Sequence, residues 1–222
     1  AQGIRFVEAD FLLSKDDAII AAHHSNLGGD CGRVSRRTLE QLRECRLSGD
    51  RRVATLEDLL ALPFEAIYID LKESSARSSK DLLDVVTRNI VAIEEAERKE
   101  SAVLMLYDIN DEVADLIRER GIRAGLKGYP GGAEGVPAMI DTAARYELEM
   151  MCINATNLTP DLVRESARRG IWHLTWDHAR EANIPHWQEL IKAGIGGIIV
   201  DTDAIVPQSA IDQWQDIRAQ ID

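Results

Sequence analysis

The sequence predicts an α/β protein, a (β/α)8 TIM-type barrel that lacks one strand. Short apolar runs that end in polar residues alternate with amphipathic segments of helical length along the 222 residues. A strand, helix, strand connection is a right-handed crossover, so the sheet is expected to be mainly parallel. The count of strands suits a barrel better than a doubly wound sheet, because no Gly-rich phosphate-binding turn is present. The apolar runs cover residues 4–10, 66–72, 102–108, 123–129, 149–155, 171–177 and 196–201.

A hairpin arm and an insertion follow the first strand. The apolar segment 18–24 comes after the short turn at residues 14–17, which leaves no room for a crossover helix, so the segment returns antiparallel. Residues 25–53 are polar and rich in glycine, apart from one amphipathic stretch at 38–46. This pattern predicts a small insertion over the mouth of the barrel.

Capping residues locate three of the helices between the strands. A side-chain acceptor just before a helical pattern satisfies the first free N–H groups, and glycine favours the end of a helix. Proline is suited to the first helical position, where no donor is needed. The expected helices are 79–99, opened by a capping box of Ser78 and Asp81, then 111–120, between Asn110 and Gly121, and 160–169, capped by Thr159.

The composition excludes several classes of function. The 38 acidic and 26 basic residues give a formal net charge of −12, which repels phosphate backbones, so no nucleic acid partner is expected. No stretch reaches the roughly 18–20 apolar residues of a membrane helix, and the chain does not open on a basic head with an apolar signal core. No linker-like tract divides the chain, so we expect a single domain over residues 1–222.

The cysteines favour a reducing compartment. Cys31, Cys45 and Cys152 are odd in number, and none lies in a C-x-x-C spacing. Cys31 and Cys45 can pair within one excursion of the chain, but free thiols are the favoured interpretation. A cytoplasmic location follows from it.

Acidic residues lie near the ends of two parallel strands. Glu8 and Asp10 are two residues apart, so they point to the same face, and Asp70 occupies a similar place on the next parallel strand. The carboxyl ends of barrel strands face the active site. Three converging carboxylates need a cation, and oxygen ligands suit Mg²⁺ or Ca²⁺. The alternative is that these acids are solvated or pair with Lys72 and Arg5.

Two further side chains lie close to these acids in sequence. His23, followed by His24, ends the hairpin arm, and an imidazole there can move a proton at physiological pH. Lys72 alternates with Asp70 onto the same face and can bind a phosphate oxygen. The alternatives are that the histidines pack or form hydrogen bonds and that Lys72 neutralises Asp70.

One aromatic and two histidines near the seventh run are weaker candidates. Trp176 is interpreted either as a wall for the alcohol group of a substrate or as core filler. His173 and His178 flank it, but they share no regular face, so packing or surface roles are favoured over a metal site.

The order of the short motifs is more specific than any one of them. The N-terminal motifs are Val7-Glu8-Ala9-Asp10, Lys15-Asp16-Asp17, the run into His23-His24, Gly32-Arg33-Val34, Thr55-Leu56-Glu57-Asp58-Leu59 and Asp70-Leu71-Lys72. The later ones are Leu158–Val163, Leu174–Asp177 and Gly196–Asp201. In order and spacing the set resembles the glycerophosphodiester phosphodiesterase family over nearly the whole chain. The resemblance implies a (β/α)8 barrel with a small insertion after the hairpin.

The resemblance also implies an activity and a site. The activity is the metal-dependent hydrolysis of a small-molecule glycerophosphodiester to a glycerol phosphate and an alcohol. Carried over to this sequence, Glu8, Asp10 and Asp70 would ligate a divalent cation, Mg²⁺ or Ca²⁺. His23 would be a general acid or base, and Lys72 would contact the phosphate.

The sequence departs from the family pattern at three places. His24 stands where the family has an acid, and Asp70 stands where it has a glutamate, one methylene longer. The family's opening His-Arg-Gly strand and Glu-Asn-Thr helix are absent, so we expect the natural polypeptide to carry roughly 25–35 further residues before Ala1, the size of the missing first βα unit. An eighth strand from residues 205–222 is the other way to close the barrel.

These departures keep two other functions open. One is a catalytically silent family member that binds a phosphodiester or phosphosugar ligand. The other is a hydrolase that acts on an unusual phosphodiester, such as a sugar or lipid conjugate.

Overall fold

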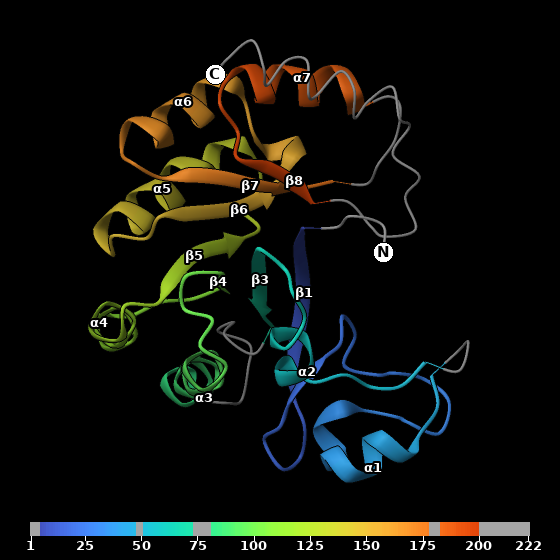
Figure 1. Ribbon diagram of the computed structural model, residues 1–222. Helices are drawn as coiled ribbons and strands as arrows, with labels where there is room; N and C mark the ends of the chain where they lie inside the picture. The colour runs from blue at the N-terminus through green and yellow to red at the C-terminus, as the bar shows by residue number, and fades with distance from the viewer. Residues whose placement is uncertain (1–4, 48–50, 73–80, 178–182, 200–222) are drawn as a thin grey trace. The chain divides into compact units, whose positions relative to one another are not determined.

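Strands and helices alternate along the chain in the computed structural model, which describes residues 5–47, 51–72, 81–177 and 183–199 (Figure 1). Each predicted parallel strand is present, and so is a short strand in the hairpin arm. No described helix is long and apolar enough to cross a membrane. The strands are β1 (Phe6–Leu13), β2 (Ile19–Ala21), β3 (Ala66–Leu71), β4 (Ala102–Leu106), β5 (Arg123–Gly128), β6 (Met150–Asn154), β7 (Trp172–Trp176) and β8 (Gly197–Ile199).

The chain divides into two compact units, residues 1–124 and 125–222. In the first unit the strand order is β2-β1-β3-β4. β2 returns antiparallel to β1, with Leu13 opposite Ile19, as the short turn predicts. β1, β3 and β4 are parallel, and the register places Asp10 opposite Asp70. This register brings acids from two strands to the same level.

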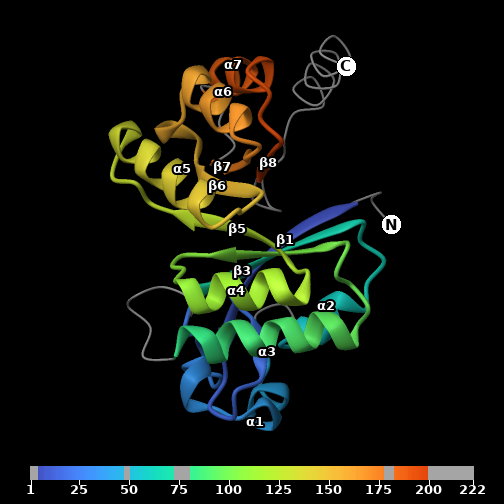
Figure 2. The ribbon, with the colours of Figure 1, turned by 90° about the vertical axis from the view of Figure 1, so that its left-hand side faces the viewer.

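Two helices cover the first unit's sheet, and Figure 2 shows α3 (Leu82–Glu95) and α4 (Asp111–Arg120) side by side along one face of β3 and β4. α4 confirms its prediction: the Asn110 side chain accepts the N–H of Val113, and Gly121 ends the helix with a left-handed φ of 63°. A residue without Cβ adopts that conformation at little cost.

The predicted bounds of α3, 79–99, are wrong. Asp81 is the N-cap, and its carboxylate accepts the N–H of Asp84. Ser78 lies outside the described residues. The helix ends at Glu95 because the chain reverses at Glu97, where φ is 56°. A non-glycine residue in the left-handed region carries no sequence signal of its own, so periodicity extended the helix too far.

The amphipathic stretch of the insertion, residues 38–46, contains a helix, α1 (Leu39–Glu44). Thr38 and Gln41 form a capping box at its start. A capping box formed by Thr55 and Asp58 opens α2 (Leu56–Leu60), the next helix. The insertion encloses a small apolar core of its own, made by Ile20, Ala22, Val34, Leu42 and Val53. Two of these residues come from the hairpin arm, so the insertion packs on the segment that ends in His23.

The expectation of free thiols in the insertion is wrong, because Cys31 and Cys45 form a disulfide with Cα atoms 5.3 Å apart. Cys31 lies in a turn, where its N–H donates to the carbonyl of Gly28, and Cys45 directly follows α1. The turn and the helix bring the two residues together, which a count of cysteines over the whole chain could not show. Cys152 is free and buried.

Loss of this disulfide is expected to loosen the insertion. The cysteines are 14 residues apart, and a loop of this size predicts a loss of about 3 kcal/mol. In the double variant Cys31→Ser/Cys45→Ser, the amides of α1 should therefore exchange with deuterium on the order of 100-fold faster. Dithiothreitol should have the same effect on the wild type and none on the double variant. Equal exchange in the wild type and the double variant would contradict a stabilising role for the bond.

In the second unit the strands are parallel in the order β5-β6-β7-β8. Their helices are α5 (Val136–Arg145), α6 (Pro160–Arg168) and α7 (Ile184–Lys192), which lie on one side of β6 and β7 in Figure 2. α6 begins as predicted, with the Thr159 side chain accepting the N–H of Leu162 and Pro160 at the first position. The helix ends at Arg168, one residue before the predicted end at Arg169, which is its C-cap.

His173 is a core residue of the second unit. It lies on β7 and is only 1% exposed, and neither ring nitrogen has a hydrogen-bond partner among the described residues. Thr175, two residues along the same face, is also buried and donates to the carbonyl of Ile153. The packing role predicted for His173 is confirmed. His178 lies outside the described residues, as do the C-terminal parts of the last predicted strand and the 205–222 segment.

Acid is expected to destabilise the protein through His173. Burial lowers the pKa of His173 to about 4, against 6.5 for an ordinary histidine. Between these values the unfolded chain binds a proton that the folded chain does not, so the free energy of unfolding falls as the pH falls through this window, by about 3 kcal/mol in total. Urea unfolding at pH 7 and pH 4.5 should show this loss in the wild type and a smaller one in His173→Leu. An equal loss in both would place the acid sensitivity elsewhere.

Candidate active site

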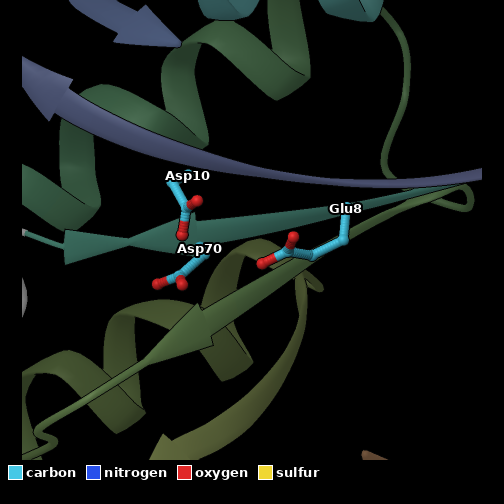
Figure 3. A group of neighbouring side chains, drawn as sticks. All are labelled: Glu8, Asp10 and Asp70. Atoms are coloured by element: carbon cyan, nitrogen blue, oxygen red, sulfur yellow. The ribbon is translucent and has the colours of Figure 1, made fainter. Parts of the chain in front are cut away.

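Three carboxylates converge at the level where β1 and β3 carry their acids. One carboxylate oxygen each from Glu8, Asp10 and Asp70 lies within 4.8 Å of the other two. Figure 3 shows the three side chains directed toward one another from the two strands. Asp70 is fully buried, and Glu8 and Asp10 are partly buried. The predicted convergence is therefore observed, within the first unit of the chain.

The charge of this cluster calls for a cation. Like charges this close repel strongly, most of all around the buried Asp70, so nearby positive charge stabilises them. Lys72 supplies part of it: Nζ lies 2.7 Å from Asp10 Oδ1 and 3.1 Å from Asp70 Oδ2. Because one ammonium cannot neutralise three ionised carboxylates, the group keeps a net negative charge. An oxygen-only donor set with remaining negative charge fits Mg²⁺ or Ca²⁺.

The carboxylates also hold Lys72 in its charged form. Burial alone would lower the pKa of Lys72, but the Coulomb attraction of Asp70 and the hydrogen bond to Asp10 outweigh it and raise this pKa. The neutralising contact of Lys72 with Asp70 is therefore observed. Its contact with a substrate phosphate stays a prediction.

Arg5 was the other basic partner considered for these acids, but its ion pair is with Glu65. Its guanidinium binds the carboxylate of Glu65. Both residues lie at the start of the strands, because Glu65 directly precedes β3 and Arg5 directly precedes β1. This pair therefore lies at the start of the two strands, before Glu8 and Asp10 on β1 and before Asp70 on β3.

His23 lies at the edge of the cluster. Its Nε2 is 4.0 Å from Asp10 Oδ2, and its Nδ1 is 3.3 Å from Nε2 of His24. The His23 side chain is 66% exposed, so an incoming ligand can reach it. A strand would send consecutive side chains to opposite faces, but β2 ends at Ala21, and the bend that follows lets both rings meet.

Sequence reasoning missed Tyr107. This residue directly follows β4, and its hydroxyl donates to Asp70 Oδ2 at 3.1 Å and accepts from Lys72 Nζ at 3.3 Å. An aromatic residue within an apolar run carries no sign of an ionisable partner. Its position at the end of a parallel strand was the signal that could have found it.

Trp176, at the end of β7, belongs to the second unit. Its ring makes an edge-to-face contact with Tyr129, at 5.7 Å between centroids. Tyr129 is 66% exposed, so this aromatic pair reaches the surface of its unit. The role of Trp176 beside a substrate stays a prediction.

Comparisons with known proteins agree with this arrangement. The sequence profile of the family described as "Glycerophosphoryl diester phosphodiesterase family" matches residues 1–203. No curated protein matched the chain.

Several solved structures share the fold. A phosphodiesterase from Oleispira antarctica, in complex with the product sn-glycerol-3-phosphate, is 15% identical with a TM-score of 0.74, over 95% of this chain and 86% of the other. A glycerophosphodiester phosphodiesterase from Parabacteroides distasonis is 16% identical with a TM-score of 0.71, over 97% and 85%. One from Thermotoga maritima is 15% identical with a TM-score of 0.63, over 97% and 83%. The likeness confirms the fold expected from the sequence.

Proposed function

Because the chain belongs to the glycerophosphoryl diester phosphodiesterase family, we propose that it hydrolyses a glycerophosphodiester to a glycerol phosphate and an alcohol with the help of a divalent cation. The observation that carries the proposal is the convergence of three carboxylates within 4.8 Å beside a lysine and a histidine. The Oleispira structure, which holds sn-glycerol-3-phosphate, supports the choice of product.

Each site residue has a proposed role. Glu8, Asp10 and Asp70 would hold Mg²⁺ or Ca²⁺, which neutralises phosphate oxygens when it is bound. The Lys72 ammonium binds a phosphate oxygen as a point charge. His23 moves a proton to or from an oxygen on phosphorus, as a general acid or base. The net reaction breaks one P–O bond and adds water across it.

We also propose that residues 1–222 form a single domain and that the substrate is a small molecule. The Cys31–Cys45 disulfide argues against the cytoplasmic location, because disulfides persist in oxidising compartments and are rare in the cytosol.

The test is release of glycerol phosphate from glycerophosphocholine. The chain is assayed as purified, after a chelator such as EDTA, and after addition of Mg²⁺ or Ca²⁺. We expect turnover that the chelator removes and one of the two ions restores. Turnover that a chelator leaves intact would contradict the metal site.

A second arm separates enzyme from binder. If sn-glycerol-3-phosphate binds in a calorimetric titration but no glycerophosphodiester is turned over, the chain is the silent family member that the substitution at His24 favours. If a sugar or lipid conjugate is the only ester cleaved, the hydrolase is retained and its substrate class changes.

A further inference from the structure

Tyr107 has a position in the site but no role in the proposed reaction. It directly follows Leu106, and Lys72 directly follows Leu71. Leu106 and Leu71 lie opposite each other in the register of β3 and β4. Tyr107 and Lys72 therefore leave neighbouring parallel strands at the same level, at the edge where the carboxylates meet.

The phenol oxygen of Tyr107 joins two charged side chains. It donates to Asp70 Oδ2 at 3.1 Å and accepts from Lys72 Nζ at 3.3 Å, and the ammonium lies 5.7 Å from the centre of the ring. A phenol has one proton and two lone pairs, so both bonds can exist together. Hydrogen bonds to ionised groups are the stronger kind. These bonds therefore hold the orientation of both charged groups.

Lys72 and a divalent cation would share two carboxylates. The ammonium lies within 3.1 Å of Asp10 Oδ1 and Asp70 Oδ2, and both residues are proposed ligands. Each carboxylate has a second oxygen for the cation, but two positive charges at the same pair of carboxylates repel each other. The Tyr107 hydroxyl is neutral, and it offers Lys72 an acceptor that the cation does not need.

We propose that Tyr107 is a positioning residue, whose hydroxyl fixes the Asp70 carboxylate for the cation and keeps Lys72 beside the site for the substrate phosphate. The inference rests on the proposed function, since it assumes the cation and the phosphate. Tyr107 acts through Asp70 and Lys72.

The first test is metal affinity, which needs no turnover. Tyr107→Phe removes the hydroxyl and keeps the ring. Partners that orient a metal ligand typically change affinity 10–100-fold, so we expect the Kd for Mg²⁺ or Ca²⁺ in a calorimetric titration of the full chain to rise about tenfold. Tyr146→Phe, which removes the hydroxyl of a tyrosine that caps α5, should keep the wild-type Kd.

The outcomes of this titration separate the two proposals. An unchanged Kd in Tyr107→Phe overturns the role toward Asp70, whether or not the chain turns over a glycerophosphodiester. A wild type that binds neither ion overturns the proposed metal site and this inference together. Metal binding that Tyr107→Phe weakens, in a chain without activity, supports the inference and overturns the reaction.

The second test isolates the contact with Lys72. With saturating metal and a varied concentration of glycerophosphocholine, Tyr107→Phe should raise KM about fivefold and change kcat less than about twofold, the pattern of a lost binding contact. In a Lys72→Met background the same substitution should change KM less than about twofold, because the side chain it positions is gone. Equal changes of KM in the two backgrounds would overturn the role toward Lys72.

Discussion

Replacing Asp70 by asparagine is expected to lower kcat/KM on glycerophosphocholine by about 10³-fold or more. Asparagine keeps the size of the side chain and an oxygen acceptor for Tyr107, but it removes the charge of the most buried of the three carboxylates. The site would then hold a divalent cation poorly. A calorimetric titration with Mg²⁺ or Ca²⁺ should show the loss of affinity directly, and the coupled glycerol-phosphate assay should show the loss of turnover.

Matched variants separate a metal ligand from an acid that only lies near the site. Glu8→Gln should behave like Asp70→Asn, because it removes a charge from the same cluster. Asp108→Asn is the control: Asp108 is exposed at the end of β4, and its Oδ1 accepts the N–H of Ile109. It should retain activity within about twofold. Unchanged turnover in Asp70→Asn or Glu8→Gln would move the chemistry to other residues.

The folded state should survive both changes in the cluster. Lys72 retains Asp10, at 2.7 Å, when Asp70 loses its charge. Circular dichroism spectra of the variants should therefore match the wild type, although removal of a partner from a buried ion pair lowers stability to some degree. A spectrum of an unfolded chain would make the loss of activity uninformative, and Glu8→Gln then carries the test, since Glu8 is less buried than Asp70.

The strands and the carboxylates were predictable because their signals are local. A buried strand of a parallel sheet is a continuous apolar run, and the structure has a strand at each predicted run, although β1 continues to Leu13, past the predicted end at Asp10. Glu8 and Asp10 share a face by alternation alone. Their meeting with Asp70 needs only that neighbouring parallel strands align, which the register of Asp10 with Asp70 confirms.

Features that depend on tertiary contacts were missed. The Cys31–Cys45 bond exists because a turn and a helix of the insertion converge, and spacing along the chain does not encode that convergence. Tyr107 joins the site through its hydroxyl, while its neighbours in sequence mark it as part of an apolar strand. The end of α3 depends on a left-handed residue, Glu97, whose type does not favour that conformation.

His23→Asn is the second substitution from which a large effect is expected. A positioned general acid or base contributes about 10²–10⁴-fold to a reaction, so kcat should fall within that range. His23 Nε2 lies 4.0 Å from Asp10 Oδ2, so His23 is next to the cluster but is not one of the proposed metal ligands. The Kd for Mg²⁺ or Ca²⁺ should therefore stay within about threefold of the wild type. Its side chain is 66% exposed, so the free energy of unfolding should change little.

His24→Asn decides which of the adjacent histidines transfers the proton. Its Nε2 contacts Nδ1 of His23 at 3.3 Å, so we expect His24 to act through its neighbour, and its loss should lower kcat less than about tenfold. A larger loss in His24→Asn than in His23→Asn would assign the proton transfer to His24. Retention of full activity in both single variants and in the double variant would show that proton transfer uses another group, and the role of the hairpin arm would then be to support the insertion that packs on Ile20 and Ala22.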